Sequence, residues 1–157
     1  MGEPTEKQKK QWLSRYIALN MRVENQLERL ARLRNEAKIP AMKESDGSQR
    51  TGGASDRMAN AAIRAIEYEE HITPQIKKAR AEMAAIVNAI ESLDNPLEAE
   101  LLDLRYINGN HCRLLPWREI AFIMYGDDDE NSMQNVYRLH GRALKHLKIA
   151  TSGNEDG

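Results

Sequence analysis

Apolar residues recur every three or four positions over two long stretches of the chain. In the first stretch, residues 7–38, only Gln26 breaks the repeat. The repeat consists of Trp12, Tyr16, Leu19, Val23, Leu30, Leu33 and Ala37. Steps of four and three place these residues on one face of a helix roughly 45–50 Å long. Pro40 is expected to end this helix.

The second stretch follows a segment rich in Gly and Ser. Residues 40–55 are expected to form a flexible loop, and Ser55 or Asp56 to cap the next helix. Pro74 is expected to kink or split that helix. Glu69 alone breaks its apolar stripe, and we interpret Glu69 as a register-setting or partly exposed residue. The stripe consists of Met58, Ala62, Ala65, Glu69, Ile72, Ile76, Ala79, Met83, Ile86, Ile90 and Leu93.

Together the two stretches predict a long antiparallel, coiled-coil-like hairpin over residues 1–93. A two-helix hairpin buries one stripe per helix and little else, so it is marginally stable alone. We therefore expect the chain to form a homo-oligomer through residues 7–93.

Three shorter helices are predicted within residues 94–150. The sequence Asp94-Asn95-Pro96 is a start signal, because Asp or Asn caps a helix and Pro suits its first position. Gly109 is expected to end this first short helix. The residues expected to face inward are Leu97, Leu101, Leu104 and Ile107.

Pro116 is expected to open the second short helix and Gly126 to end it. Its inward face consists of Trp117, Ile120, Ala121 and Met124. The third helix is predicted from Met133 to about Lys148, with Ser132 as its cap. Its inward face consists of Val136, Leu139, His140, Ala143, Leu144 and Leu147. Residues 126–131 are then a longer turn than the three or four residues usual in a helix-turn-helix.

The outer face of this last helix carries the candidate chemistry. No acidic residue occurs from Met133 to Thr151, although the net charge of the chain is −1. Arg and Gln or Asn suit guanine and adenine edges, and Lys reaches phosphates. The predicted contacts with double-stranded DNA are Ser132, Gln134, Asn135, Tyr137, Arg138, Arg142, Lys145 and Lys148. The alternative is a basic, solvated face on an ordinary core helix.

An acidic run, Asp127 to Glu130, precedes the basic helix. We interpret it as a solvated turn that complements the positive end of that helix. The alternative is a contact with a basic patch on a partner such as RNA polymerase.

Several function classes find no support in the sequence. The single cysteine, Cys112, excludes an internal disulfide, and His140 and His146 are too far apart to share a zinc ion on one helix face. There is no catalytic, phosphate-loop or cofactor motif. No apolar run approaches the roughly 20 residues that span a bilayer, and MGEPTEKQKKQW lacks the apolar core of a secretory signal. We expect a cytoplasmic, non-enzymatic protein with no metal, cofactor or membrane partner.

Three C-terminal segments resemble the helix-turn-helix of sigma factor region 4. They are LLDLRYINGN (101–110), LPWREIAFIMYG (115–126) and VYRLHGRALKHLK (136–148). The last segment is more similar still to phage and prophage late transcription regulators of the ArpU and RinA type. The resemblance of this chain to those regulators extends from about residue 27 to residue 148. The resemblance implies a phage-encoded protein of a Gram-positive host that binds promoter DNA, activates late genes and touches RNA polymerase.

The sequence therefore predicts an all-α protein in three parts. These are the hairpin (1–93), a sigma-region-4-like helix-turn-helix domain (94–150) and a disordered tail (151–157). Two other functions remain open. A phage small terminase subunit, which recognises a packaging site, also joins a helix-turn-helix to oligomerising helices, but usually places the DNA-binding part first. A protein interaction module that no longer binds DNA would account for the acidic turn.

Overall fold

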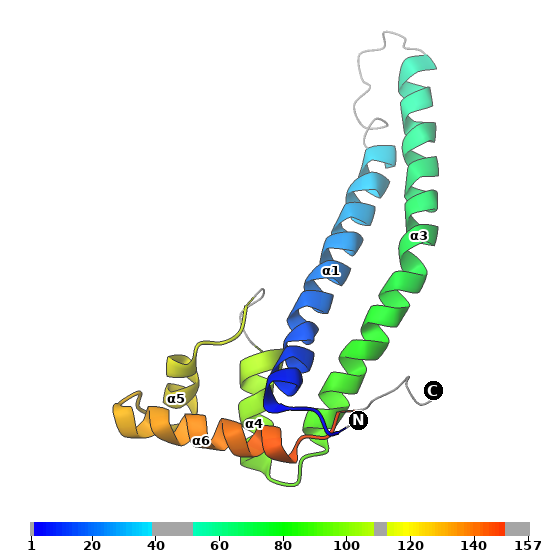
Figure 1. Cartoon of the computed structure of the whole chain (residues 1–157). Helices are drawn as coiled ribbons and strands as arrows, with labels where there is room; N and C mark the ends of the chain where they lie inside the picture. Colours follow the sequence, from blue (N-terminus) through cyan, green and yellow to red (C-terminus); the bar gives the residue numbers. More distant parts are fainter. Residues whose placement is uncertain (1, 39–51, 109–112, 150–157) are drawn as a thin grey trace. The chain divides into compact units, whose positions relative to one another are not determined.

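The computed structural model describes residues 2–38, 52–108 and 113–149, with only the backbone described for 52–55 (Figure 1). Every regular element within these ranges is a helix, which confirms the all-α prediction. The elements are α1 (Glu6–Lys38), α3 (Gly52–Glu91), α4 (Pro96–Leu102), the π-helical turn η1 (Asp103–Ile107), α5 (Trp117–Tyr125) and α6 (Glu130–His146). The predictions for Pro40, residues 40–51, Gly109, Cys112 and the tail at 151–157 lie outside the described residues.

The chain divides into two compact units, and the division differs from the expected boundary after residue 93. One unit consists of residues 22–79. The other combines residues 1–21 with residues 80–157. The first part of α1 and the last part of α3 therefore belong with the C-terminal helices and not with a separate hairpin.

Within residues 22–79, α1 and α3 run antiparallel. Polar pairs along them fix the direction, because partners in α3 move toward its N-terminus as those in α1 move toward its C-terminus. The pairs are Gln26–Gln75 at 2.7 Å, Arg34–Glu69 at 2.7 Å and Glu36–Arg64 at 3.1 Å. The seam between them is apolar and contains the buried residues Val23, Leu30, Ala61, Ala65, Ile72, Ile76 and Ala79.

Two polar residues on the predicted stripes find partners at this seam. Gln26 occupies the gap in the first stripe and its amide donates to Gln75. Glu69 is exposed and paired with Arg34, which confirms its interpretation as a partly exposed polar residue. Neither carboxylate nor amide is buried without a partner, so the interruptions cost the seam little.

Helix α3 starts earlier than predicted, and of the two outcomes expected at Pro74, a kink or a split, the split does not occur. It begins at Gly52 and not at Ser55 or Asp56, because each further helical residue adds a backbone hydrogen bond once a helix is established. It also continues through Pro74 without being split. Pro74 has no N–H to donate to the carbonyl of Glu70, four residues earlier. The hydroxyl of Thr73 donates to the neighbouring Glu69 carbonyl at 2.6 Å.

The other unit has a single apolar core to which six helical segments contribute. Leu13 comes from α1, and Ile86 and Ile90 come from the end of α3. The C-terminal helices supply Leu101, Leu102, Tyr106, Ile120, Ala121, Val136, Leu139, Ala143 and Leu144, with Leu147 just after α6. Both predicted inward faces, that of α5 and that of α6, contribute to this core.

Of the inward residues predicted for α4 and η1, Leu101 is buried and Leu104 and Ile107 pack against the core, but Leu97 was placed wrongly. Leu97 is 53% exposed, whereas its neighbour Glu98 is 2% exposed. The prediction assumed α-helical periodicity up to Ile107, but the chain becomes π-helical at Asp103. Within α4 the buried residues Glu98, Leu101 and Leu102 keep α-helical spacing, and the wider spacing of the π-helical turn then buries Tyr106 while Leu104 and Ile107 are half-buried.

Lys9 joins the two ends of this unit. It lies off the predicted apolar stripe yet is only 8% exposed. Its Nζ donates to the carbonyl of Leu144 at 2.7 Å, across a sequence separation of 135 residues. The last carbonyls of a helix have no intrahelical partner and carry partial negative charge, so the ammonium group stabilises the end of α6.

Replacing Lys9 by Met tests this contact, because Met keeps an apolar stem and removes the donor. We expect the free energy of unfolding to fall by about 1–3 kcal/mol, the range for a hydrogen bond to a charged group. Urea denaturation followed by circular dichroism measures the change. Lys7→Met, at an exposed position of the same helix, should change it by less than about 0.5 kcal/mol. Equal losses in the two variants would contradict the assigned role of Lys9.

Candidate nucleic-acid interface

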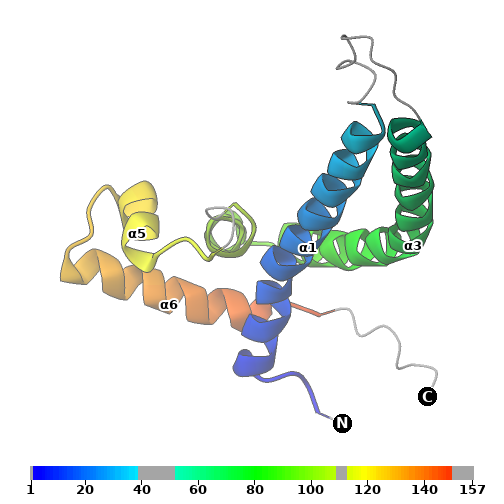
Figure 2. The ribbon, with the colours of Figure 1, turned by 90° about the horizontal axis from the view of Figure 1, so that it is seen from above.

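Helices α5 and α6 are joined by a turn of four residues, 126–129 (Figures 1 and 2). Gly126 ends α5 in the left-handed conformation, with φ of 76°, and its N–H donates to the Phe122 carbonyl. The six-residue turn predicted from the sequence is wrong, because α6 begins at Glu130. The observed turn has the length usual in a helix-turn-helix.

The start of α6 is fixed by Asp129 and not by Ser132. The Asp129 carboxylate accepts the backbone N–H of Ser132 at 2.8 Å. Hydrogen bonds from the backbone and side chain of Ser132 hold the pKa of Asp129 below its usual value. Ser132 is inside the helix and 8% exposed, so it does not belong to the outer face on which it was predicted.

The other acidic residues of the turn also have local partners. Asp127 accepts the backbone N–H of Asp129 at 3.1 Å, and Asp128 lies 3.5 Å from the guanidinium of Arg118. These contacts favour the interpretation of the acidic run as a turn that caps α6.

Helix α6 separates its two faces sharply. Val136, Leu139, His140, Ala143 and Leu144 are buried, and Leu147 is buried just beyond its end. The outer side is exposed at Gln134, Arg138, Arg142, Lys145 and Lys148, and half-buried at Asn135. Seven of the eight predicted DNA contacts therefore lie away from the core, Ser132 being the exception. Arg138 donates to the Asn135 amide oxygen at 3.3 Å, which brings two potential base-contacting groups together.

An aromatic cluster fixes one edge of this outer face. The Trp117 ring meets Tyr137 edge-on at 5.7 Å and His140 at 4.6 Å between ring centroids. The guanidinium of Arg105 covers Trp117 at 3.9 Å from the ring centroid and donates to the Leu115 carbonyl at 2.7 Å. Tyr137, 49% exposed, is thereby held at the border between core and solvent.

His140 is a neutral member of this cluster. Burial, together with the charges of Lys10 and Arg105, lowers the pKa of His140 to about 4. Burial raises the pKa of Tyr106, so its hydroxyl keeps its proton, and it shares a hydrogen bond of 2.9 Å with Nε2 of His140. The basic character of this surface therefore comes from Arg138, Arg142 and Lys145 of α6, with Lys148 just beyond its end, and not from His140.

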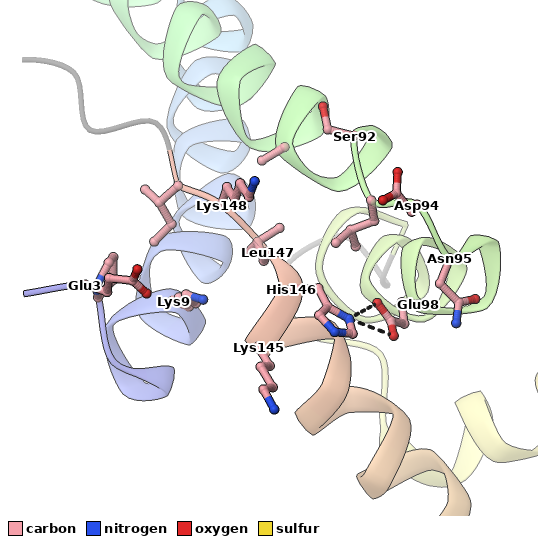
Figure 3. Close-up of a pocket in the computed structure, with 14 residues that line it drawn as sticks. Glu3, Lys9, Ser92, Asp94, Asn95, Glu98, Lys145, His146, Leu147 and Lys148 are labelled. Carbon is pink, nitrogen blue, oxygen red and sulfur yellow. Dashed lines mark hydrogen bonds and ion pairs between the residues drawn. The ribbon is translucent and has the colours of Figure 1, made fainter.

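A second polar contact lies at the C-terminal end of α6 (Figure 3). Nδ1 of His146 is 2.9 and 3.1 Å from the two oxygens of the Glu98 carboxylate, so it supplies the buried carboxylate with a hydrogen bond. A cavity of about 900 Å³ adjoins this pair. Its charged lining mixes signs, with Lys9, Lys145 and Lys148 beside Glu3, Asp94 and Glu98.

Sequence reasoning missed three functional candidates: Lys9, Lys10 and Arg105. Arg105 lies in the LRY segment but was given no role, and the two lysines precede the first apolar stripe. The only signal in the sequence was the cluster of lysines at positions 7, 9 and 10. This cluster does not indicate that Lys9 contacts α6.

No family model, curated protein or solved structure matches this chain. Among the described residues, no helix has the length and apolar character needed to cross a bilayer. The same residues contain no group of three His, Cys, Asp or Glu side chains arranged to hold a metal ion.

The pKa of His140 gives a testable pH dependence. An unfolded histidine has a pKa near 6.5. Between that pH and about pH 4, His140 is protonated in the unfolded chain but stays neutral in the folded chain. The contribution of His140 to stability is complete above about pH 6.5 and is lost as the pH falls toward 4, by about 3 kcal/mol in total.

Replacing His140 by Gln keeps an acceptor for Tyr106 and removes the titration. The stability of this variant, measured by urea denaturation between pH 4 and 7, should therefore fall less steeply with decreasing pH than that of the unchanged chain. His71→Gln, at an exposed histidine on α3, is the control and should retain the full slope. Parallel profiles for the His140 variant and the unchanged chain would disprove the assignment.

Proposed function

We propose that this chain is a sequence-specific double-stranded DNA-binding protein that regulates transcription, with the outer face of α6 as its reading surface. In this proposal it is a phage-encoded activator of late genes that also contacts RNA polymerase. The resemblance of its C-terminal segments to sigma factor region 4 and to ArpU- and RinA-type regulators motivates the biological setting.

The observation that carries the proposal is the separation of faces on α6. Its inward side is buried in the core, whereas Gln134, Arg138, Arg142 and Lys145 on the outer side are exposed and available to a partner. Its charged residues from Met133 to Ile149 are all basic. A helix of 17 residues that meets solvent with Arg, Lys, Gln and Asn suits the major groove of DNA in size and chemistry.

The positions along α6 assign different roles to its residues. The first two turns of a recognition helix usually enter the groove most deeply. Gln134, Asn135 and Arg138 are therefore proposed to meet base edges, and Lys145 and Lys148 to meet phosphates. Tyr137, held edge-on by Trp117, is placed to contact a sugar or a thymine methyl group.

Two rival functions predict different partners. A small terminase subunit would bind the packaging-start region, whereas a late-gene activator would bind upstream of the late operon. Mapping the genomic fragments that the purified chain retains, from the genome that encodes it, separates these two. An interaction module would retain none, and its main support is weakened because each aspartate of the acidic turn has a local partner.

Arg138→Ala tests base reading. Loss of a bidentate guanine contact should weaken binding to the preferred site by about 1–3 kcal/mol, relax preference at one base pair and affect random DNA much less. Lys145→Gln should instead reduce the slope of log K against log salt by about 0.9 without altering preference.

Fluorescence anisotropy with the mapped site and a scrambled duplex measures both changes. Arg80→Ala, at an exposed arginine of α3, is the matched control and should resemble the unchanged chain. An Arg138 variant that weakens both duplexes equally would place this residue on a phosphate and refute the assigned register. No effect on either duplex, with circular dichroism unchanged, would favour the interaction module.

We also propose that the chain self-associates through residues 22–79. Leu27, Ile63 and Ile66 are 40, 51 and 57% exposed on this unit, and a second copy of the chain would cover apolar surface there. Sedimentation of the full chain at micromolar concentration should show a dimer or larger species. Ile63→Ser with Ile66→Ser should dissociate it, whereas Leu97→Ser, at an exposed leucine of the other unit, should not. A monomeric unchanged chain would refute this.

A further inference from the structure

A second cavity opens beside the outer face of α6. Its volume is about 440 Å³, and α1, η1, α5 and α6 all contribute to its lining. Lys10 and Ser14 come from α1, Arg105 from η1, and Tyr137 and Gly141 from α6. The cavity thus brings the N-terminal helix to the border of the proposed reading surface, and every lining residue belongs to the same compact unit.

The lining favours an anion. Lys10 and Arg105 supply two positive charges against the single carboxylate of Glu6. Lys10 is exposed, and within the described residues no hydrogen bond or ion pair engages its ammonium group. Arg105 adds its charge to the lining while its Nη1 donates to the Leu115 carbonyl. The hydroxyl groups of Ser14 and Tyr137 add possible donors at the same place.

Gly141 provides an independent observation. It lies in the interior of α6, where Gly is less favourable than Ala by up to about 1 kcal/mol. Neither backbone nor packing requires it: Gly126 is the one glycine with positive φ in the described chain, and a Cβ at Gly141 would meet nothing within 4 Å. The missing side chain leaves open space against the helix, where a ligand can approach its backbone closely.

We propose that this cavity binds a phosphate group, supplied by the backbone of the DNA that α6 reads. Lys10 and Arg105 neutralise the phosphate while the strand passes over Gly141. The inference rests on the proposed function for the source of the phosphate, and it extends the interface to α1. A second source with the same chemistry is a free phosphorylated molecule.

The first experiment measures DNA affinity against salt concentration for the full chain. Lys10→Gln should reduce the slope of log K against log salt by about 0.9, the value for one lost phosphate contact. Lys78→Gln removes the same charge from an exposed position in the other unit and should leave the slope unchanged. Circular dichroism should be the same for all three proteins.

The second variant does not depend on charge. Gly141→Ala should raise the melting temperature by a few degrees, because Ala favours the helix and has room. It should also weaken DNA binding severalfold, because the methyl group occupies the path of the strand. A more stable variant that binds DNA as tightly as the unchanged chain overturns the close approach at Gly141.

A third measurement separates the two phosphate sources and the two proposals. Inorganic phosphate is titrated while the Gly141 amide and the Trp117 indole are followed by NMR. If the unchanged chain binds no DNA, the proposed function fails. If phosphate still shifts the two NMR signals, and these shifts disappear in Lys10→Gln, the cavity is a site for a free phosphorylated molecule. The same assignment follows if DNA binds with a salt slope insensitive to Lys10. Absence of both responses, in salt slope and in NMR shift, overturns the phosphate site.

Discussion

The contact between the Lys9 ammonium and the Leu144 carbonyl is the interaction on which the C-terminal unit depends. The core of that unit draws on six helical segments and includes Leu13 of α1, and this hydrogen bond joins α1 to the end of α6. It satisfies a carbonyl at the end of a helix with a charge of the favourable sign. Leu13, one turn further along α1, then reaches the core without any exposed surface.

This arrangement explains why the compact units do not follow the order of the chain. A two-helix hairpin cannot bury enough apolar area for stability. In this chain the beginning of α1 and the end of α3 belong to the core of the C-terminal helices. Leu13, Ile86 and Ile90 pack there with α4, η1, α5 and α6. The candidate interface on α6 and the parts of the long helices within residues 1–21 and 80–91 therefore belong to one compact unit with a shared core.

Local signals in the sequence were sufficient for much of the fold. Asn95 caps α4, Pro116 precedes α5 and Gly126 ends it, as expected from the residue types alone. The inward face of α6 was also predictable, because its apolar residues keep the α-helical period without a break. These features depend on neighbours within a few positions, which is the range over which capping and periodicity act.

The failures share a different cause. The π-helical turn η1 buries Tyr106, and no local residue pattern indicates a change of helical period. Ser132 and Asp129 are both good caps, so the choice between them, and hence the turn length, depends on where α6 packs. The cavity at Lys10 and Arg105 is assembled from residues about 95 positions apart, a separation that periodicity does not address.

The separation of 135 residues between Lys9 and its partner also bears on how the protein is made. During synthesis the N-terminal part of a chain leaves the ribosome first, and contacts between distant residues close late. Residues 22–79 have their partners nearby and can pair while synthesis continues. The first two turns of α1 must wait, with Leu13 unburied, until the last helix has emerged. The apolar side chain of Leu13 is thus among the last to reach its final environment, and until then it is open to contacts that the folded protein does not make.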